Sequence, residues 1–293
     1  MKPPSAEPVP AVSSRHRLQA RRIVRISRVV ADLERSEAFY RDALGFITIS
    51  RGSATPVLTD AQETLMRLGS VTIALVRFRS PGEPYPPDSR SNDLWFQHLA
   101  IVVSDMDAAY VHLRRFGRWQ PITEAGPQQL PQSNGGVRAF KFHDPDGHPL
   151  ELIWFPKSPQ IAQSQTAAAL FLTVDHSALS VSATTRSLNF YRTLGFQVTN
   201  RSLNQGPAQN RLDGLSEAQV HVTALQPVGA TKPGLELLCY TPPGRPCHAA
   251  LNDTVTDWVT IEVTTLFGER YRTVQDPDGH RLMLIAQGDG FPA

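Results

Sequence analysis

The segment FHDPDGHPLEL at residues 142–152 recurs near the end of the chain as QDPDGHRLML at residues 275–284. In each copy an Asp-Pro-Asp-Gly tetrapeptide precedes a run of apolar residues. Pro fixes one backbone angle and Gly tolerates a left-handed conformation, so the tetrapeptide predicts a tight turn. The apolar run after it predicts the second strand of a hairpin. The repeated turn and strand therefore indicate that one structural unit occurs twice.

Three further matches precede this one, in the same order in both halves. FYRDALGF at 39–46 recurs as FYRTLGF at 190–196, one residue shorter. SPGEP at 80–84 recurs as PPGRP at 242–246, and Asn92-Asp93 recurs as Asn252-Asp253. Four matches in one order are hard to obtain by chance, and such self-similarity is the signature of an internal duplication.

A finer repeat of strand, helix and strands lies inside each half. In the first module a β-branched run at 26–30 predicts a strand, and Asp32 is placed to cap a helix over about 33–44 that Gly45 ends. The second module has the same plan, with a strand at 98–103, Asp105 as cap, and a helix that runs to Phe116 and stops at Gly117.

The second half repeats this plan less completely. The third module begins with a strand at 175–181 and continues with a helix over roughly 185–194. The fourth module begins with a strand at 258–263, but too few residues separate it from Tyr271 to hold a helix. We therefore predict an α+β fold of four βαβββ modules, the fourth truncated, that pair into two cupped mixed β-sheets. The predicted division is a disordered tail at 1–21, a first domain at 22–156, a linker at 157–170 and a second domain at 171–288.

Composition narrows the class of partners. Hydrophobic residues make up 41% of the chain and charged residues 19%, so the chain should fold. The formal net charge is +2, and no dense Lys/Arg stretch alternates with exposed aromatic residues, which argues against nucleic acid. No run approaches the roughly 20 apolar residues of a membrane helix, and the N-terminus lacks the apolar core of a secretory signal. We expect a cytoplasmic monomer or homodimer that binds a small molecule, not a membrane.

The repeated segments resemble the vicinal oxygen chelate superfamily, which includes glyoxalase I, bleomycin-resistance proteins and extradiol dioxygenases. The resemblance covers about residues 23–286. Besides the two turn segments, the matching stretches are VADLERSEAFYRDALGF at 30–46, HLAIVVSDMD at 98–107 and HSALSV at 176–181. Function varies widely among proteins with this fold, so the resemblance does not define the chemistry.

The resemblance implies metal ligands at two places in each module, near the start of the first strand and on the last strand. His98 and Glu151 stand there in the second module, and His176 and Glu236 in the third. The first module has Arg25 and Ala74 at these places, and the fourth has Trp258 and Met283. If the second and third modules share one cup, the four potential ligands converge there and the four replaced positions fall together in the other cup.

Such a set of two His and two Glu resembles the site of fused glyoxalase I proteins and suits one divalent ion, Zn, Ni, Co, Mn or Fe. The ion would polarise a carbonyl and stabilise an enediolate, while a Glu acts as general base at carbon. Glu151 resembles the base of glyoxalase I, and Glu236 is its symmetry-related counterpart. The leading hypothesis is a glyoxalase-type lyase or isomerase acting on an α-hydroxycarbonyl-like substrate. The alternatives are an Fe(II) extradiol ring-cleaving dioxygenase and a protein that sequesters a drug or metabolite without catalysis.

Simpler interpretations compete with the ligand hypothesis. An isolated His at the head of a strand is commonly structural, and strand alternation could place Glu151 and Glu236 in solvent instead of at a metal. His143, His148 and His280 lie in or beside the turns, so we expect them at the surface. In the other cup we expect Arg25 to form a salt bridge or bind an anion, and Trp258 and Met283 to fill space.

Overall fold

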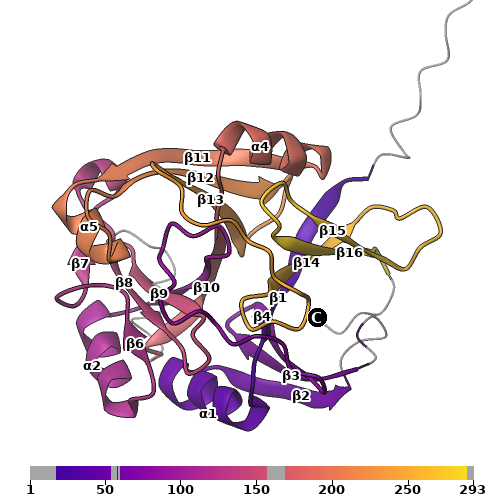
Figure 1. Ribbon diagram of the computed structural model, residues 1–293, viewed down its shortest axis with the longest axis horizontal. Coiled ribbons are helices and arrows are strands. Elements are labelled where there is room, and N and C mark those ends of the chain that lie inside the picture. Colours follow the sequence, from indigo (N-terminus) through magenta and orange to yellow (C-terminus); the bar gives the residue numbers. More distant parts are fainter. Residues whose placement is uncertain (1–17, 54–57, 59, 157–168, 289–293) are drawn as a thin grey trace, which may run out of the picture.

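The computed structural model describes residues 18–53, 58, 60–156 and 169–288. Most of the expected tail and of the expected linker lies outside these residues. The described strands form two mixed β-sheets (Figure 1). None of the helices in this part of the chain combines the length and the apolar character needed to span a membrane.

Each sheet combines one module from each half of the sequence, which confirms the predicted pairing. The strand order is β15-β16-β14-β1-β4-β3-β2 in the seven-stranded sheet, and β11-β12-β13-β10-β5-β9-β8-β6 in the nine-stranded sheet, with β7 paired to β8. The strands of the seven-stranded sheet are β1 (Ala20–Val29), β2 (Ile47–Ser53), β3 (Ala61–Leu68), β4 (Val71–Phe78), β14 (Asp257–Val263), β15 (Tyr271–Gln275) and β16 (Arg281–Ala286). Those of the nine-stranded sheet are β5 (Gln97–Val103), β6 (Gln120–Pro121), β7 (Gln128–Gln129), β8 (Arg138–His143), β9 (Pro149–Trp154), β10 (Phe171–Ser180), β11 (Phe196–Gln205), β12 (Gln219–Pro227) and β13 (Gly234–Tyr240).

The helices of the first two modules begin and end where their capping residues predict. In α1 (Leu33–Leu44) the Asp32 side chain accepts a hydrogen bond from the backbone N–H of Arg35, and Gly45 adopts a φ of 73°. In α2 (Met106–Phe116) Asp105 accepts from the backbone N–H of Ala108. These side chains satisfy backbone donors that a helix leaves unpaired.

The third and fourth modules depart from this pattern. The helix α4 (Thr184–Thr193) has no side-chain cap, and no helix separates β14 from β15 in the described chain, as expected for the truncated module.

Two short elements were not predicted. The 3-10 helix η2 (Gln132–Asn134) belongs to the second module, and α5 (Pro207–Asp213) lies between β11 and β12 in the third.

The strand register is the same in both sheets, so it tests the alignment of the two halves. In the nine-stranded sheet β10 runs antiparallel to β5 with Ala178 opposite His98, and in the other sheet β1 runs antiparallel to β14 with Ser27 opposite Trp258. The parallel strand pairs match as well. Glu236 lies opposite Ala178 in the nine-stranded sheet, and Ala74 lies opposite Ser27 in the other. In the same way, Glu151 lies opposite Ala100, and Met283 lies opposite Thr260. The register therefore equates Arg25 with His176 and Ala74 with Glu236. It likewise equates Trp258 with His98 and Met283 with Glu151.

The four replaced positions are filled by packing in the seven-stranded sheet. Trp258 and Met283 belong to an apolar cluster with Leu65, Ala74 and neighbouring residues, as expected. The Arg25 Nη1 atom lies 3.4 Å from Glu63 Oε2, and both side chains are buried, so the predicted salt bridge is present. A buried ion pair embedded in apolar side chains contributes little net stability, whereas each buried apolar side chain contributes roughly 1.5–3 kcal/mol.

Candidate metal centre

His98 and His176 meet on one face of the nine-stranded sheet. They come from the adjacent antiparallel strands β5 and β10 and lie two register positions apart, which places both side chains on the same side. Their Nε2 atoms are 3.3 Å apart, although 78 positions separate the two residues in sequence. The structure thus brings together the two histidines that the pattern of replaced residues selected.

Glu151 completes a compact group with these histidines. It lies on β9, which runs parallel to β5, and its Oε2 atom is 3.2 Å from His98 Nε2 and 3.8 Å from His176 Nε2. One ligand atom from each of the three buried residues lies within 4.8 Å of the other two. Ligand atoms that share one ion at about 2.1 Å lie roughly 3.0–3.4 Å from one another, so small side-chain movements would complete a site.

Glu236 lies beside this group instead of within it. Its Oε2 atom is 3.5 Å from His176 Nε2, and its side chain is 25% exposed, against 7% for Glu151. The four predicted residues therefore share one face, but they are not equivalent. Three form the compact group, and Glu236 is at its open edge.

Burial and neighbouring charges together set the protonation of the group. Burial lowers the pKa of His98 to about 4, because the charged imidazolium is poorly solvated. Burial opposes ionisation of Glu151, but the neighbouring His98 and Lys141 outweigh it and lower the pKa of this carboxyl. Burial raises the pKa of Glu236. Burial opposes protonation of His176, but the carboxylates of Glu236 and Asp175 outweigh it and raise the pKa of this imidazole. A neutral imidazole and an ionised carboxylate are the forms that bind metal ions, so an ion that enters the group would displace a proton from His176.

Asp175 and Lys232 support His176 from behind, and neither was predicted. The His176 Nδ1 atom lies 2.9 Å from Asp175 Oδ2, and Lys232 Nζ donates to the same oxygen at 2.8 Å. A carboxylate at Nδ1 fixes the imidazole so that Nε2 carries the lone pair, a common arrangement behind metal-binding histidines. The register of β10 is irregular between Val174 and His176, which allows adjacent side chains to lie together. The Asp-His dipeptide is visible in the sequence, but this irregularity is not.

The residues fit a divalent ion on electrostatic grounds. When the His176 ring is neutral and its Nδ1–H is bound to Asp175, the Nε2 lone pair faces the Glu151 carboxylate and the other imidazole. Acceptor atoms that converge in a buried place repel one another unless a cation or proton lies between them. His98, His176 and Glu151 are therefore the residues that would hold an ion.

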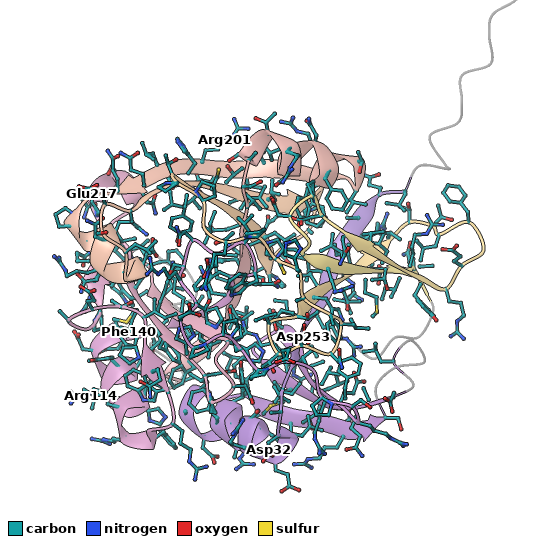
Figure 2. The ribbon with its side chains drawn as sticks, viewed as in Figure 1. Asp32, Arg114, Phe140, Arg201, Glu217 and Asp253 are labelled. Carbon is teal, nitrogen blue, oxygen red and sulfur yellow. The ribbon has the colours of Figure 1, made fainter. Side chains whose placement is uncertain are left out.

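The group opens into a cavity of about 970 Å³. Apolar side chains such as Leu130, Val137 and Leu238 line part of this cavity, and Lys141, Gln209 and Arg201 line another part. Arg201 projects from β11 at the outside of the molecule (Figure 2). The volume suits a small-molecule ligand.

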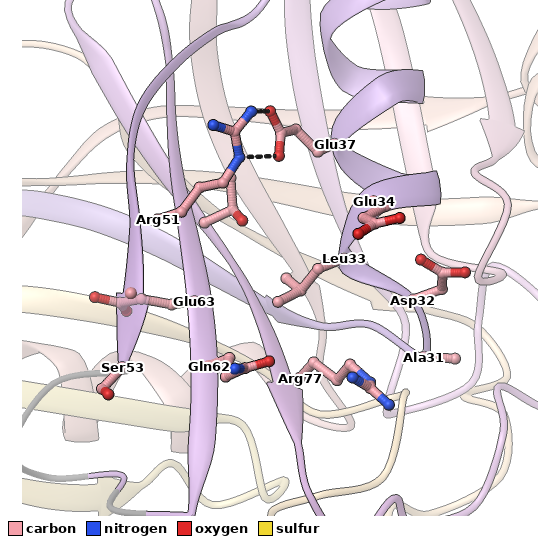
Figure 3. Close-up of a pocket in the computed structure, with 12 residues that line it drawn as sticks. Ala31, Asp32, Leu33, Glu34, Glu37, Arg51, Ser53, Gln62, Glu63 and Arg77 are labelled. Carbon is pink, nitrogen blue, oxygen red and sulfur yellow. Dashed lines mark hydrogen bonds and ion pairs between the residues drawn. The ribbon is translucent and has the colours of Figure 1, made fainter.

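A second hollow, of about 800 Å³, lies between the start of α1 and strands β2 to β4 (Figure 3). Its main ionic contact is the pair of Arg51 with Glu37, in which Arg51 Nε donates to the carboxylate at 2.8 Å. The described residues that line this hollow include no histidine or cysteine. It therefore offers no metal-ligand set comparable with that of the nine-stranded sheet.

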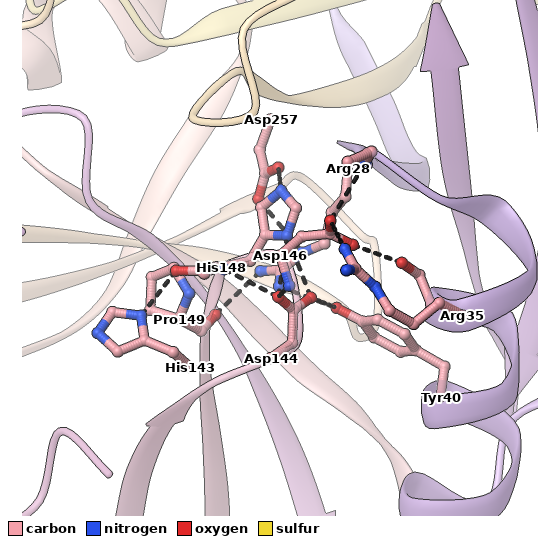
Figure 4. A network of polar contacts seen from close by, with 12 residues as sticks. Arg28, Arg35, Tyr40, His143, Asp144, Asp146, His148, Pro149 and Asp257 are labelled. Atoms are coloured by element: carbon pink, nitrogen blue, oxygen red, sulfur yellow. Dashed lines mark hydrogen bonds and ion pairs between the residues drawn. The ribbon is translucent and has the colours of Figure 1, made fainter. Parts of the chain in front are cut away.

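The expectation that the turn histidines lie at the surface is wrong for His148 and His280, which are 0% and 6% exposed, while His143 is partly buried. His148 Nδ1 lies 3.1 Å from Asp144 Oδ2, and its Nε2 lies 3.5 Å from Asp257 Oδ1 (Figure 4). The turns fold against the interior of the other modules, so proximity to a turn did not imply exposure.

Arg28 and Tyr40 complete this buried polar network. Arg28 donates to the Tyr40 hydroxyl at 3.1 Å, and its Nε atom lies 3.2 Å from Asp257 Oδ2. The Tyr40 hydroxyl donates to Asp144 Oδ2 at 2.9 Å, so this tyrosine joins α1 to the turn that follows β8. The network joins the first, second and fourth modules away from the candidate metal centre.

Comparison with known proteins agrees with this architecture. Residues 22–152 match the family model described as Glyoxalase/Bleomycin resistance protein/Dioxygenase superfamily. The uncharacterized protein YaeR of Escherichia coli (strain K12) is 32% identical over 147 residues, which cover 46% of this chain and 97% of YaeR.

Solved structures extend the similarity over both halves. Glyoxalase I from Zea mays superposes with a TM-score of 0.63 at 15% identity, covering 92% of this chain and 93% of the maize chain. A putative dioxygenase from Bacillus subtilis gives a TM-score of 0.57 at 11% identity, covering 92% and 86% of the two chains. At such identities these structures show a shared fold. Together with the matching family model and the similarity to YaeR, they show that the chain belongs to the glyoxalase/bleomycin resistance protein/dioxygenase superfamily.

Proposed function

We propose that this protein is a divalent-metal-dependent lyase or isomerase of the glyoxalase type, acting on a small α-hydroxycarbonyl-like substrate. The observation that carries the proposal is the convergence of His98, His176 and Glu151 at the floor of a ligand-sized cavity. All of these residues come from one chain, so a monomer can hold the complete site.

His98, His176 and Glu151 would hold the ion, which when bound supplies Lewis acidity that polarises a carbonyl oxygen. Asp175 keeps the His176 ring oriented through its contact with Nδ1. These contacts prepare the site before a substrate enters.

Glu236 is the stronger candidate for the general base. Glu151 lies close to both imidazoles, whereas Glu236 contacts only His176 among the group and is the more exposed carboxylate. Glu236 would take the proton from the carbon next to the substrate carbonyl and return it to a neighbouring atom. Glu151, which resembles the base of glyoxalase I, would take this role if Glu236 serves as a ligand of the ion instead.

Solvent hydrogen exchange tests this proposal. We would load the purified protein separately with Zn, Ni, Co, Mn and Fe(II), add hemithioacetals or other α-hydroxycarbonyl compounds in D₂O, and follow deuterium incorporation by NMR. Exchange that needs both an ion and Glu236 is the expected result. No exchange at the carbon beside the carbonyl with any ion would contradict the proposal.

One observation favours a second function. A compact group of two His and one carboxylate is the ligand set of non-haem Fe(II) oxygenases. On this hypothesis the protein would be an extradiol ring-cleaving dioxygenase, with Glu236 outside the ligand set. Oxygen consumption with Fe(II) and catechols would distinguish it from the lyase or isomerase. A protein that only sequesters a ligand would bind it without exchange and without oxygen uptake.

A further inference from the structure

We propose that Lys141, held in place by Asp213, binds a carboxylate of the substrate that is separate from the oxygens facing the ion. This inference rests on the proposed function and narrows its substrate class to oxygenated acids. It assigns a role to a side chain of the cavity wall that neither the metal centre nor the general base requires.

Lys141 is directed to the same face as the metal centre. It lies on β8 directly opposite Glu151 on β9, and residues opposite each other in an antiparallel pair have Cβ atoms about 4.5–5.5 Å apart on one face. Its side chain is nearly fully buried and lines the same cavity as His98 and His176. A ligand lying over Glu151 is therefore within reach of the Lys141 ammonium.

Asp213 fixes the position of this ammonium. Lys141 Nζ donates to Asp213 Oδ1 at 2.7 Å, and Gln209 Nε2 donates to the other carboxylate oxygen at 2.7 Å. Both partners come from α5, the short helix of the third module, which therefore meets the second module across the cavity. An ammonium group has three N–H donors, so one bond to Asp213 leaves further donors for a ligand.

The ion pair of Lys141 with Asp213 is not needed merely to hold α5 in place. Three other hydrogen bonds already fasten the end of this helix: Thr123 Oγ1 to the Leu212 carbonyl at 3.0 Å, Ser91 Oγ to the Asp213 carbonyl at 2.8 Å, and the Glu124 N–H to the Arg211 carbonyl at 2.8 Å. A buried ion pair is often no more stable than apolar residues of the same volume. A purely structural role therefore explains its place in the cavity wall poorly.

Another polar side chain of the wall has an acceptor atom with no partner among the described residues. Gln209 is buried and lines the cavity, and its Oε1 atom has no hydrogen-bond partner among the described residues. Buried acceptors in folded proteins are almost always satisfied. A hydroxyl of the ligand beside its carboxylate would satisfy Gln209 Oε1.

The charge of the occupied cavity favours an anion. Glu151 and Glu236 would offset the two charges of the ion, Asp213 offsets Lys141, and Asp175 offsets Lys232. Arg201, which also lines the cavity, adds one more positive charge. An acidic substrate therefore complements the cavity better than a neutral one.

Binding of catechol derivatives to the Ni-loaded protein tests the inference without reference to catalysis. Isothermal titration would compare 3,4-dihydroxybenzoate with 4-methylcatechol, which has a methyl group in place of the carboxylate. A charge-assisted hydrogen bond predicts that the acid binds about tenfold more tightly. K141M/D213N removes both charges of the pair, so this variant should bind the two compounds with about equal affinity.

R138M is the matched control. Arg138 lies on the same strand, three residues from Lys141, and pairs with Asp107 of α2 instead of lining the cavity. It should retain the tenfold preference. Comparison of 2,3- with 3,4-dihydroxybenzoate in the unmodified protein needs no variant. A fixed ammonium discriminates between these isomers by at least several fold, whereas a general positive field does not.

The outcomes separate the two proposals. Suppose that Ni and 4-methylcatechol bind to the unmodified protein. If 3,4-dihydroxybenzoate then binds no more tightly than 4-methylcatechol, or if K141M/D213N still prefers the acid tenfold, the Lys141 inference is wrong and the metal centre stands. Equal affinity for the two dihydroxybenzoates would also overturn it, even if the double variant failed to fold. If the unmodified protein binds no ion, the proposed function fails and the inference fails with it.

Discussion

Replacing Asp144 with Asn should destabilise the protein far more than the same change at Asp276, its equivalent in the other half. Asp144 accepts hydrogen bonds from the Tyr40 hydroxyl and from the backbone N–H groups of Asp146 and His148, each at 2.9 Å. It also lies beside His148 in a network that contains the buried Arg28. Removing one charge from such a buried network costs about 3–5 kcal/mol.

Asp276 has nearly the same turn without the same ionic surroundings. It accepts from the backbone N–H groups of Asp278 and His280 at 2.9 Å, and from the Tyr191 hydroxyl at 3.3 Å. By strand register, Leu179 occupies the position of Arg28, so the guanidinium is replaced by an apolar side chain. The D276N variant should therefore lose about 1–2 kcal/mol, as for one weakened hydrogen-bond set.

Urea unfolding of both variants, followed by circular dichroism, measures this difference. Its pH dependence provides a second check. Burial opposes ionisation of Asp144, but His148 and Arg28 outweigh it and hold the pKa of this carboxyl well below its ordinary value. Asp144 therefore contributes stability above its unfolded pKa of about 3.9, and that contribution falls as the pH drops toward the folded pKa. The gap between the unmodified protein and D144N should be complete at pH 7 and narrow below about pH 4. Equal losses for D144N and D276N, or a gap that widens in acid, would refute the reasoning.

Three other predictions concern the two sheets. E151Q should weaken metal binding at least tenfold because it removes a charged ligand of the compact group, whereas E236Q should retain the ion and lose hydrogen exchange. Metal titration measures the first effect and NMR the second. The reverse pattern would exchange the roles of the two glutamates. D175N should lower metal affinity about 10–100-fold by releasing the His176 ring, while K232M, whose side chain is 44% exposed, should have a smaller effect on the same titration. R25M/E63L should leave the free energy of unfolding unchanged or raise it by about 1–4 kcal/mol, since apolar residues replace a buried ion pair without leaving a charge unpaired; a large loss of stability in urea would contradict this.

The sequence was sufficient for the duplication, the capped helices and the pairing of the modules. The helices depend on local signals, such as Asp32 and Gly45 around α1. The pairing of the modules depends on the four replaced ligand positions, which fall together in one cup only if the second module pairs with the third. The position of His98 beside His176 followed from that pairing.

Other features depend on contacts that a single chain read in order does not reveal. The irregular register of β10 brings Asp175 to His176, and α5 carries Asp213 across to Lys141. His148 and His280 are buried because other modules cover their turns. The unequal positions of Glu151 and Glu236 likewise arise from side-chain packing, since their strand positions are equivalent.

The central claim is that one divalent ion binds between the second and third modules. Metal analysis of the purified protein and of H98A/H176A, after equilibration with Zn, Ni, Co, Mn or Fe(II) and removal of free metal, tests it most directly. We predict about one ion per chain in the unmodified protein and none in a folded double variant. No bound ion in the unmodified protein, or the same ion content in both, would contradict the claim.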